Sequence, residues 1–364
     1  MKIQRLFWIH PSRRGSGESE TQSPRRQNSV APKLASTGRM KPWRVAIAVL
    51  CFAVVPLEGC QQNPKSELRA QTDPLDIAVS ILPQKYFVQR VGGENVRVNV
   101  LVEPGASPAT YEPKPSQLRA LSEAEAYFRI RVPFENAWMD KIQAANPQMR
   151  LVDTTQDIER MPMSAHSHHG SGGHQQDANP DPHVWLSPAL VKIQAQTIYD
   201  TLAELDPPRQ AEYRQNLERF IADIGGLEAE IRASLANLQQ RKFMVFHPAW
   251  GYFAREYDLE MIPIEIGGTE PSAAEMAQLI ARAKQENIQV IFAQPQFSTK
   301  AAETIANEIG GEVILINPLA PDWLENLGAI ASTFSRVLSE GRSTIRVGVL
   351  PFPRQPRPVA MNIR

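Results

Sequence analysis

Residues 242–253 read Lys-Phe-Met-Val-Phe-His-Pro-Ala-Trp-Gly-Tyr-Phe. The apolar run before the histidine predicts a buried strand over 243–246, and the stretch after it predicts a helix over 248–257. His247 would then lie at the carboxyl end of a strand, which is where open α/β sheets bind their ligands. A lone histidine at such a place is more often a hydrogen-bonded structural residue. Its role therefore depends on which other side chains the fold brings near it.

The same alternation of strand and helix runs through most of the chain. Apolar runs predict strands at 77–82, 96–102, 127–130 and 151–152, and again at 243–246, 261–266, 290–293 and 313–316, with helical stretches between them. Repeated βα order is typical of a mainly parallel sheet with helices on its faces. We therefore predict an α/β fold of two lobes.

A long helical region separates the two halves. It covers 188–205 and, after Asp206-Pro207-Pro208, continues from 209 to about 238 with apolar residues at three- and four-residue spacing. At about 1.5 Å per residue, a helix of roughly 30 residues reaches along two lobes, and we interpret it as a strut. A coiled-coil dimerisation helix is the alternative, but the apolar stripe covers few heptads, so we expect a monomer.

These patterns predict the following organisation along the chain. It comprises a disordered extension at 1–39, a lipoprotein signal at 40–60, a linker at 61–75, an N-terminal α/β lobe at 76–187 that includes a His-rich loop at 164–180, the linking helical region at 188–240, a C-terminal α/β lobe at 241–340, and a tail at 341–364. The tail is expected to be loosely attached, although its apolar run at 345–350 is also suited to an edge strand.

Composition limits the chemistry of the chain. The 364 residues contain 39 Lys+Arg and 39 Asp+Glu, a balance that gives no reason to expect a nucleic-acid partner. Both cysteines, Cys51 and Cys60, lie near the N-terminus, so the body that follows has no thiolate metal site, catalytic cysteine or disulfide framework. A metal site would have to use imidazole, carboxylate, amide or water, which suits zinc and manganese.

The N-terminal segment has the features of an export signal. From Met40, basic residues precede an apolar run at 45–56 that is too short to cross a bilayer, and Leu57-Glu58-Gly59-Cys60 follows. This tetrapeptide resembles a bacterial lipobox, which predicts lipidation of Cys60 and an anchor on the outer side of the cytoplasmic membrane. An ordinary buried or signal-anchor helix is the alternative. Met40 is an alternative start to Met1.

Five of the seven histidines lie between 166 and 183. The first four, His166, His168, His169 and His174, are mixed with Gly and Ser, a composition that predicts a mobile metal-attracting loop. His183 is different, because Asp181-Pro182 precedes it and an apolar anchor follows, just where a helix should begin after Ser187. We expect His183 and His247 to converge in a cleft between the lobes.

Four segments carry a resemblance to a known family: Asp-Pro-His-Val-Trp-Leu-Ser-Pro at 181–188, Phe-His-Pro-Ala-Trp-Gly-Tyr-Phe at 246–253, Pro-Gly-Ala-Ser-Pro-Ala-Thr-Tyr-Glu-Pro at 104–113 and Gln-Pro-Gln-Phe-Ser at 294–298. In their order along the chain, these segments resemble those of the zinc/manganese solute-binding lipoproteins of ABC importers, and the resemblance runs from about residue 76 to 340. The resemblance implies two α/β lobes joined by a long helix, with a metal ion between them and His183 and His247 as ligands. It also implies that a His-rich loop precedes the Asp-Pro-His segment in zinc-binding members.

The chain departs from the family pattern at two ligand positions. Ala109 stands where the family has its first histidine ligand, and Asn317 stands where it has a C-terminal carboxylate. Two imidazoles leave zinc short of its usual donors. We prefer a loop histidine, that is His166, His168, His169 or His174, as the donor that completes the shell. The alternatives are a carboxylate from Glu112 or Glu270, the weak amide oxygen of Asn317, or water. The loop is alternatively a low-affinity collector that never enters the site.

These observations predict an extracytoplasmic, lipid-anchored, periplasmic binding protein that captures zinc, or next manganese, and delivers it to an ABC permease. The alternatives are a surface lipoprotein for metal sequestration, metal delivery or adhesion, and a binder of a metal chelate. An enzyme is not expected, since the chain has no His-Glu-x-x-His or Gly-x-Ser-x-Gly motif. Protonation of histidine near pH 6.5 should weaken binding.

Overall fold

The computed structural model describes residues 73–163, 180–265 and 267–339. The lipoprotein signal with Cys60, the four histidines of the His-rich loop and the C-terminal tail lie outside these residues. None of the helices within these ranges combines the length and apolarity needed to cross a membrane.

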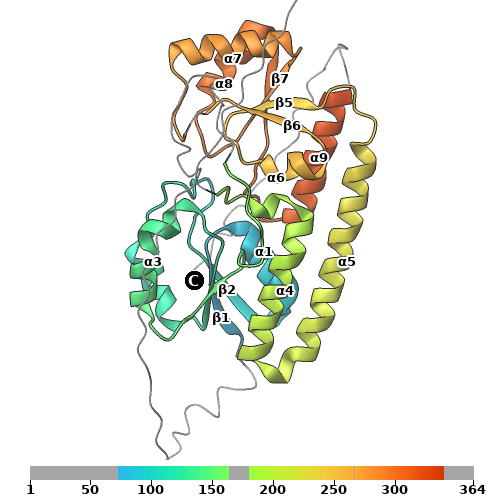
Figure 1. Ribbon diagram of the computed structural model, residues 1–364. Coiled ribbons are helices and arrows are strands. Elements are labelled where there is room, and N and C mark those ends of the chain that lie inside the picture. Colours follow the sequence, from blue (N-terminus) through green and yellow to red (C-terminus); the bar gives the residue numbers. More distant parts are fainter. Residues whose placement is uncertain (1–72, 164–179, 266, 340–364) are drawn as a thin grey trace, which may run out of the picture. The chain divides into compact units, whose positions relative to one another are not determined.

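The first sheet has four parallel strands in the order β2-β1-β3-β4. Its strands are β1 (Leu75–Val79), β2 (Val96–Val100), β3 (Ala126–Arg129) and β4 (Arg150–Asp153). The helices between them are α1 (Leu82–Gly92), α2 (Pro115–Ala120) and α3 (Pro133–Ala145) (Figure 1). Each of these helices has proline at its first or second position. Proline suits this position because the first helical N–H has no partner within the helix.

The second sheet repeats this topology in the order β6-β5-β7-β8. Its strands are β5 (Lys242–Val245), β6 (Glu260–Pro263), β7 (Val290–Ala293) and β8 (Glu312–Leu315). The helices that follow them are α6 (Gly251–Glu256), α7 (Ala273–Gln285), α8 (Lys300–Ile309) and α9 (Trp323–Ser339). The predicted α/β fold with two mainly parallel sheets is confirmed.

In each sheet the chain passes from the first strand to one side and then crosses to the other side for the third strand. The carboxyl ends of β5 and β7 therefore flank a topological switch point, where connecting segments leave in opposite directions and a ligand has room to bind. His247 follows β5, and the segment 294–298 follows β7.

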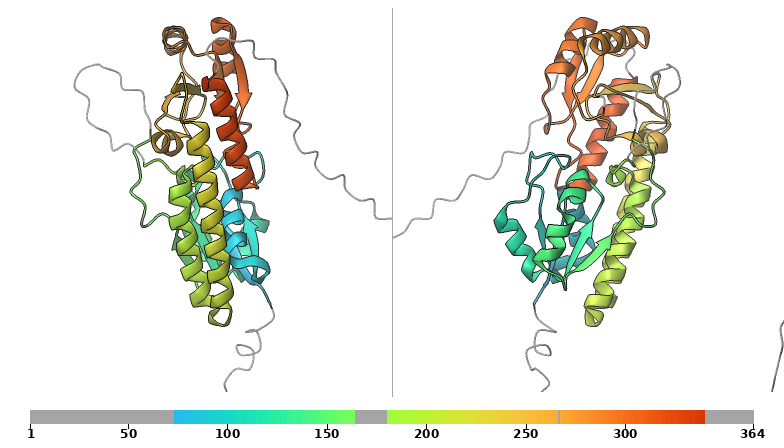
Figure 2. Two further views of the ribbon diagram at one scale, coloured as in Figure 1. Left: turned by 90° about the vertical axis from the view of Figure 1, so that its right-hand side faces the viewer. Right: turned by 60° about the vertical axis from the view of Figure 1, so that its left-hand side comes forward.

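Two long helices link the sheets in sequence. They are α4 (Pro188–Leu205) and α5 (Gln210–Ser234), which lie side by side (Figures 1 and 2). The predicted helix to about 238 ends instead at Ser234, and Leu235 packs into the core after it. One face of α5 is buried, and the helix packs against α1, α4 and α9. Elements from both halves of the sequence therefore pack against the apolar face of α5, as expected for a strut.

Alternate residues of β5 face two different cores. Phe243 and Val245 belong to a large core that includes α4, α5 and α9, whereas Met244 and Phe246, the residue directly after the strand, belong to a smaller core with α7 and α8. This is the period-two alternation of a strand that is covered on both faces. The helix predicted over 248–257 is shorter in the structure, where α6 begins only at Gly251.

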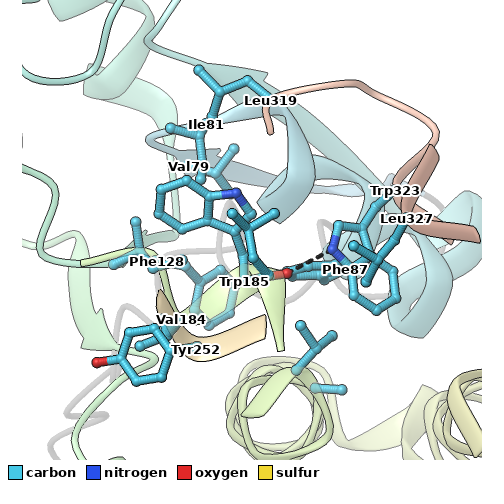
Figure 3. Close-up of a cluster of buried hydrophobic side chains, with 14 of the residues drawn as sticks. Val79, Ile81, Phe87, Phe128, Val184, Trp185, Tyr252, Leu319, Trp323 and Leu327 are labelled. Carbon is cyan, nitrogen blue, oxygen red and sulfur yellow. Dashed lines mark hydrogen bonds between the residues drawn. The ribbon is translucent and has the colours of Figure 1, made fainter. Parts of the chain in front are cut away.

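The turn before α4 is tied to the second half of the chain by two indoles (Figure 3). The Trp185 Nε1–H donates to the Pro318 carbonyl at 2.8 Å, and the Trp323 Nε1–H donates to the Trp185 carbonyl at 2.7 Å. Both tryptophans are fully buried among apolar side chains that include Phe87 and Leu327. Residues 184–186 are thereby fixed against the start of α9.

Candidate metal centre

His183 lies in a turn that its neighbours hold rigidly. The carboxylate oxygen Oδ1 of Asp181 accepts hydrogen bonds from the backbone N–H of His183 at 2.9 Å and contacts its ring Nδ1 at 2.7 Å. The Asp181 carbonyl accepts from the hydroxyl of Tyr252 in α6 at 3.0 Å. Ser187 then caps α4, its Oγ accepting from the Leu190 N–H, so the helix begins where the sequence predicted. The His183 ring is buried, and a carboxylate contacts its Nδ1 but not its Nε2.

His247 is fixed at the end of β5 by three contacts. The side-chain amide of Gln294 clamps its backbone, accepting from the His247 N–H at 3.1 Å and donating to its carbonyl at 2.8 Å. Glu265 Oε2 contacts the ring Nδ1 at 2.6 Å. The ring stacks on Phe297 with a centroid distance of 4.6 Å. Backbone, ring edge and ring face are all held, so the direction of Nε2 is set before any ligand arrives.

The two histidines converge as the sequence predicted. Their Nε2 atoms are 3.3 Å apart, and their ring centroids are 5.1 Å apart. Zinc binds imidazole nitrogen at about 2.0–2.1 Å with tetrahedral angles, which places two such nitrogens roughly 3.3–3.4 Å from each other. The observed separation is therefore the one that a single zinc ion between the two rings requires.

The electrostatics of the pair favour a cation. A carboxylate accepts hydrogen bonds but does not donate them, so Asp181 and Glu265 place the ring proton of each neutral imidazole on Nδ1. The Nε2 lone pairs of His183 and His247 then face each other, and this contact is favourable only with a proton or a metal ion between them. Burial lowers the pKa of His247, and the neighbouring His183 lowers it further, whereas Glu265 acts in the opposite direction. The neutral, metal-binding form of His247 is therefore stabilised.

A small cavity of about 50 Å³ adjoins the two rings. A water molecule occupies roughly 10–15 Å³ on this measure, so the cavity holds an ion with a few waters at most. Among the described residues, its lining is mostly apolar; it consists of His183, His247, Gln296, Ser107, Pro108, Ala109, Val132, Pro133, Met163, Pro182, Trp185, Phe297, Pro318 and Leu319.

None of the other predicted ligand residues within the described ranges offers a free donor to the cavity. Ala109 lines the cavity, so the position of the family's first histidine faces the site without offering a donor. The Asn317 oxygen accepts hydrogen bonds from Gln296 Nε2 at 2.8 Å and from the Leu319 N–H at 3.0 Å, which occupies both of its lone pairs. Glu112 and Glu270 are exposed and do not line the cavity. The loop histidines lie outside the described residues.

Within 73–163, 180–265 and 267–339, no group of three or more His, Cys, Asp or Glu residues is arranged to hold a metal ion. The carboxylates nearest to the imidazoles, Asp181 and Glu265, contact the Nδ1 atoms rather than the Nε2 atoms. Among the described residues, the site thus offers two imidazole donors, and any third donor from these residues has to be of another kind.

Sequence reasoning missed several residues of this site. The sequence predicts no individual role for Asp181, Glu265, Gln294 or Gln296, although all but Glu265 belong to segments that resemble the family. One signal could have found the last three, because all of them follow directly on strands β6 and β7 at the carboxyl edge of the second sheet.

A comparison with known protein families decides the relationship. The model described as "Zinc-uptake complex component A periplasmic" matches residues 77–337, well over half of the chain. The chain belongs to this zinc-uptake family. The resemblance seen in the sequence is confirmed. A family of uptake components also agrees with the expectation that the chain is not an enzyme.

Relatives of this zinc-uptake family match along most of their length. The high-affinity zinc uptake system protein ZnuA of Bacillus subtilis (strain 168) is 28% identical over 286 residues, which cover 77% of this chain and 89% of the relative. A crystal structure of ZnuA is 50% identical, with a TM-score of 0.69, and the match covers 73% of this chain and 100% of that one. The structure of a 138–173 deletion mutant of ZnuA with zinc bound is 49% identical, with a TM-score of 0.69 and coverage of 74% and 100%.

Proposed function

We propose that this protein is the solute-binding component of a zinc importer and that it holds the zinc ion between Nε2 of His183 and Nε2 of His247. The observation that carries this proposal is the 3.3 Å separation of the two nitrogens. A carboxylate behind each ring supports it, because such a partner fixes the tautomer and makes the imidazole a stronger ligand.

Zinc can bind without a rearrangement of the site, because both donor nitrogens are already oriented toward each other. At neutral pH the ion replaces any proton shared by the two Nε2 atoms, and neither ring has to turn. Zinc–nitrogen distances tolerate deviations of only about 0.2 Å. A small displacement of the end of β5, which His247 follows, relative to the turn that carries His183 therefore weakens zinc binding and releases the ion. This is a movement of packed elements rather than a wide hinge closure.

The donors favour zinc over manganese. Imidazole nitrogen suits zinc, whereas manganese prefers carboxylate, carbonyl and water oxygens. Of the described residues that line the cavity, none is a carboxylate. Zinc is therefore the proposed cargo, and manganese is the weaker candidate.

The cavity favours an ion over an organic chelate. Pockets for organic ligands of drug size measure about 300–1,000 Å³. The cavity beside His183 and His247 measures about 50 Å³. The proposed cargo is therefore a zinc ion with one or two waters.

Location and partner follow from the family together with the predicted signal. The family model describes a periplasmic component. The lipobox-like sequence ending at Cys60 adds a lipid anchor to this proposal, and delivery requires an ABC permease in the same membrane. Both remain predictions, as does the part played by the His-rich loop.

The test is a calorimetric zinc titration of the full chain beside two variants. His183→Ala/His247→Ala should abolish tight binding of one equivalent, because it removes both nitrogen donors. Deletion of 164–179 should lower affinity if loop histidines complete the shell, and should leave it unchanged if the loop only collects ions. One tightly bound zinc ion in the double-alanine variant would refute the proposed site.

A further inference from the structure

Gln296 lies beside the two imidazoles in the same cavity. It belongs to the segment after β7, next to Phe297, whose ring stacks on His247. An inference about this side chain rests on the proposed function, because it concerns the shell of the same ion.

The orientation of the Gln296 amide can be deduced from its neighbours. The backbone N–H of Leu319 donates to Asn317 at 3.0 Å, and a backbone N–H can only donate, so the acceptor atom of Asn317 is its oxygen. The same oxygen lies 2.8 Å from the Gln296 amide and therefore has to receive a hydrogen from it. The atom of Gln296 that faces Asn317 is its Nε2. The Oε1 atom is consequently the one left for another partner.

This oxygen has no hydrogen-bond partner among the described residues, although it is buried. A buried acceptor without a donor is unfavourable, because it has lost its hydration without replacement. A cation that enters the cavity removes this penalty. The Gln296 side chain thus brings to the cavity lining an acceptor that is already desolvated and has no partner among the described residues.

The sheet topology also places Gln296 where a ligand would bind, independently of its hydrogen bonds. β5 and β7 are adjacent parallel strands that flank the switch point of the second sheet. His247 follows the first of them and Gln296 follows the second, so both reach the place where such sheets bind ligands. Of the two positions at which the family pattern has further ligands, Ala109 lines the cavity without a donor, and the Asn317 oxygen is already occupied by hydrogen bonds.

We propose that Gln296 Oε1 is the third protein ligand of the zinc ion, beside Nε2 of His183 and Nε2 of His247. The remaining coordination position is filled by water on the side of Ala109. Asn317 acts as a positioning residue, because it holds the Gln296 amide with its oxygen toward the ion. The donor set is neutral, so the site carries the full charge of its cargo.

The experiment measures zinc affinity by competition with a chelator, together with the visible spectrum of the cobalt(II) form, on the full chain. Gln296→Leu should weaken zinc binding by roughly tenfold or more, the scale expected when a metal site loses a supporting group. It should also change the cobalt(II) bands, since these respond to the ligands of the metal. The matched control is Gln285→Leu, which removes an exposed amide at the end of α7 and should change neither quantity.

A second variant keeps the inference testable if a leucine disturbs the fold. Gln296→Met preserves the length of the side chain but replaces the amide oxygen by a soft thioether sulfur, which favours copper(I). The ratio of copper(I) affinity to zinc affinity should rise by roughly tenfold or more, which a purely structural role would not produce.

The outcomes separate this inference from the proposed function. If Gln296→Leu binds zinc like Gln285→Leu, or binds it more weakly with an unchanged cobalt(II) spectrum, Gln296 is not a ligand, although the two histidines still are. If His183→Ala/His247→Ala keeps tight zinc binding, the site itself is wrong, whatever Gln296 does.

Discussion

At the scale of single residues, the site is determined by the groups behind its donors. Asp181 and Glu265 each contact the Nδ1 atom of one histidine, at 2.7 and 2.6 Å. These carboxylates contact neither Nε2 atom, yet they decide which nitrogen of each ring carries the lone pair that would face the proposed zinc ion. Their effect on zinc is therefore measurable without removing a ligand.

Glu265→Gln should lower zinc affinity by about 10- to 100-fold, because the neutral amide no longer polarises the His247 ring or specifies its tautomer. The measurement is chelator competition at neutral pH. Glu270→Gln is the control, since Glu270 is exposed and lies outside the cavity lining. An equal loss in the control would instead support a carboxylate ligand from the exposed loop.

The pH dependence of binding also follows from His247. Because burial lowers its pKa, the ring stays neutral below the usual value of about 6.5, and zinc binding should persist to a lower pH than for a free imidazole. Zinc titrations between about pH 8 and pH 5 test this expectation. A loss of binding centred above pH 6.5 would contradict it.

The lowered pKa of His247 also makes the free energy of unfolding of the metal-free protein depend on pH, in a defined direction. Between the unfolded and the folded pKa of His247, the unfolded chain binds more protons. Its contribution to the free energy of unfolding is therefore fully present above about pH 6.5 and is lost as the pH falls through that window toward the folded pKa. Denaturant unfolding should show this component, and His247→Gln should lack it.

At the scale of elements, the start of α3 depends on one buried carboxylate. Glu135 is fully buried and accepts from the Ile130 N–H at 2.9 Å and from the Arg131 N–H at 2.8 Å. It also accepts from the hydroxyl of Ser80, at the end of β1. Burial raises the pKa of Glu135 despite these donors. The carboxylate thereby joins β1, β3 and α3, and the N-terminal end of a helix is a favourable place for its charge.

Glu135→Leu should lower the free energy of unfolding by about 3 kcal/mol or more, because it leaves several buried donors without an acceptor. Chemical denaturation measures the change. Glu123→Leu is the control, since Glu123 is exposed in the turn before β3 and should change stability by less than about 0.5 kcal/mol. Equal stability of the two variants would refute the role given to Glu135.

The contrast between these elements and the site shows what the sequence could reveal. Apolar periodicity located the strands and the long helices, because the pattern of burial is local. His183 and His247 stood out because each ends an apolar run beside a proline or a helix start. The role of Glu265 depends on a ring 18 positions earlier in the chain, and the Gln296 orientation depends on Asn317, 21 positions later. Such partners are created by tertiary packing and leave no local pattern.

At the scale of the whole molecule, α5 and the indole contacts join the two halves that supply the proposed ligands. α5 packs against α1 of the first half and α9 of the second. His183 and His247 are 64 positions apart in sequence. A ligand that bridges them exists only in the folded chain, so binding and folding are linked.

Zinc at 100 times its dissociation constant should therefore stabilise the fold by about 2.7 kcal/mol. For a body of this size, that corresponds to a rise in the unfolding midpoint of roughly 5–10 °C. Circular dichroism with and without zinc measures the rise. His183→Ala/His247→Ala should unfold at the same temperature in both conditions, and a retained rise would show that the ion binds elsewhere.

The indole of Trp185 lies beside His183, with its ring centroid 5.1 Å from that of the imidazole. Its Nε1–H donates a hydrogen bond to the Pro318 carbonyl. A doubly charged ion in the cavity that Trp185 and His183 both line would alter the electric field at the indole. The intrinsic emission of the protein should consequently change in intensity or wavelength as the cargo enters and leaves. Rapid-mixing optics would then follow uptake and discharge in real time, with no added dye and no change to the chain.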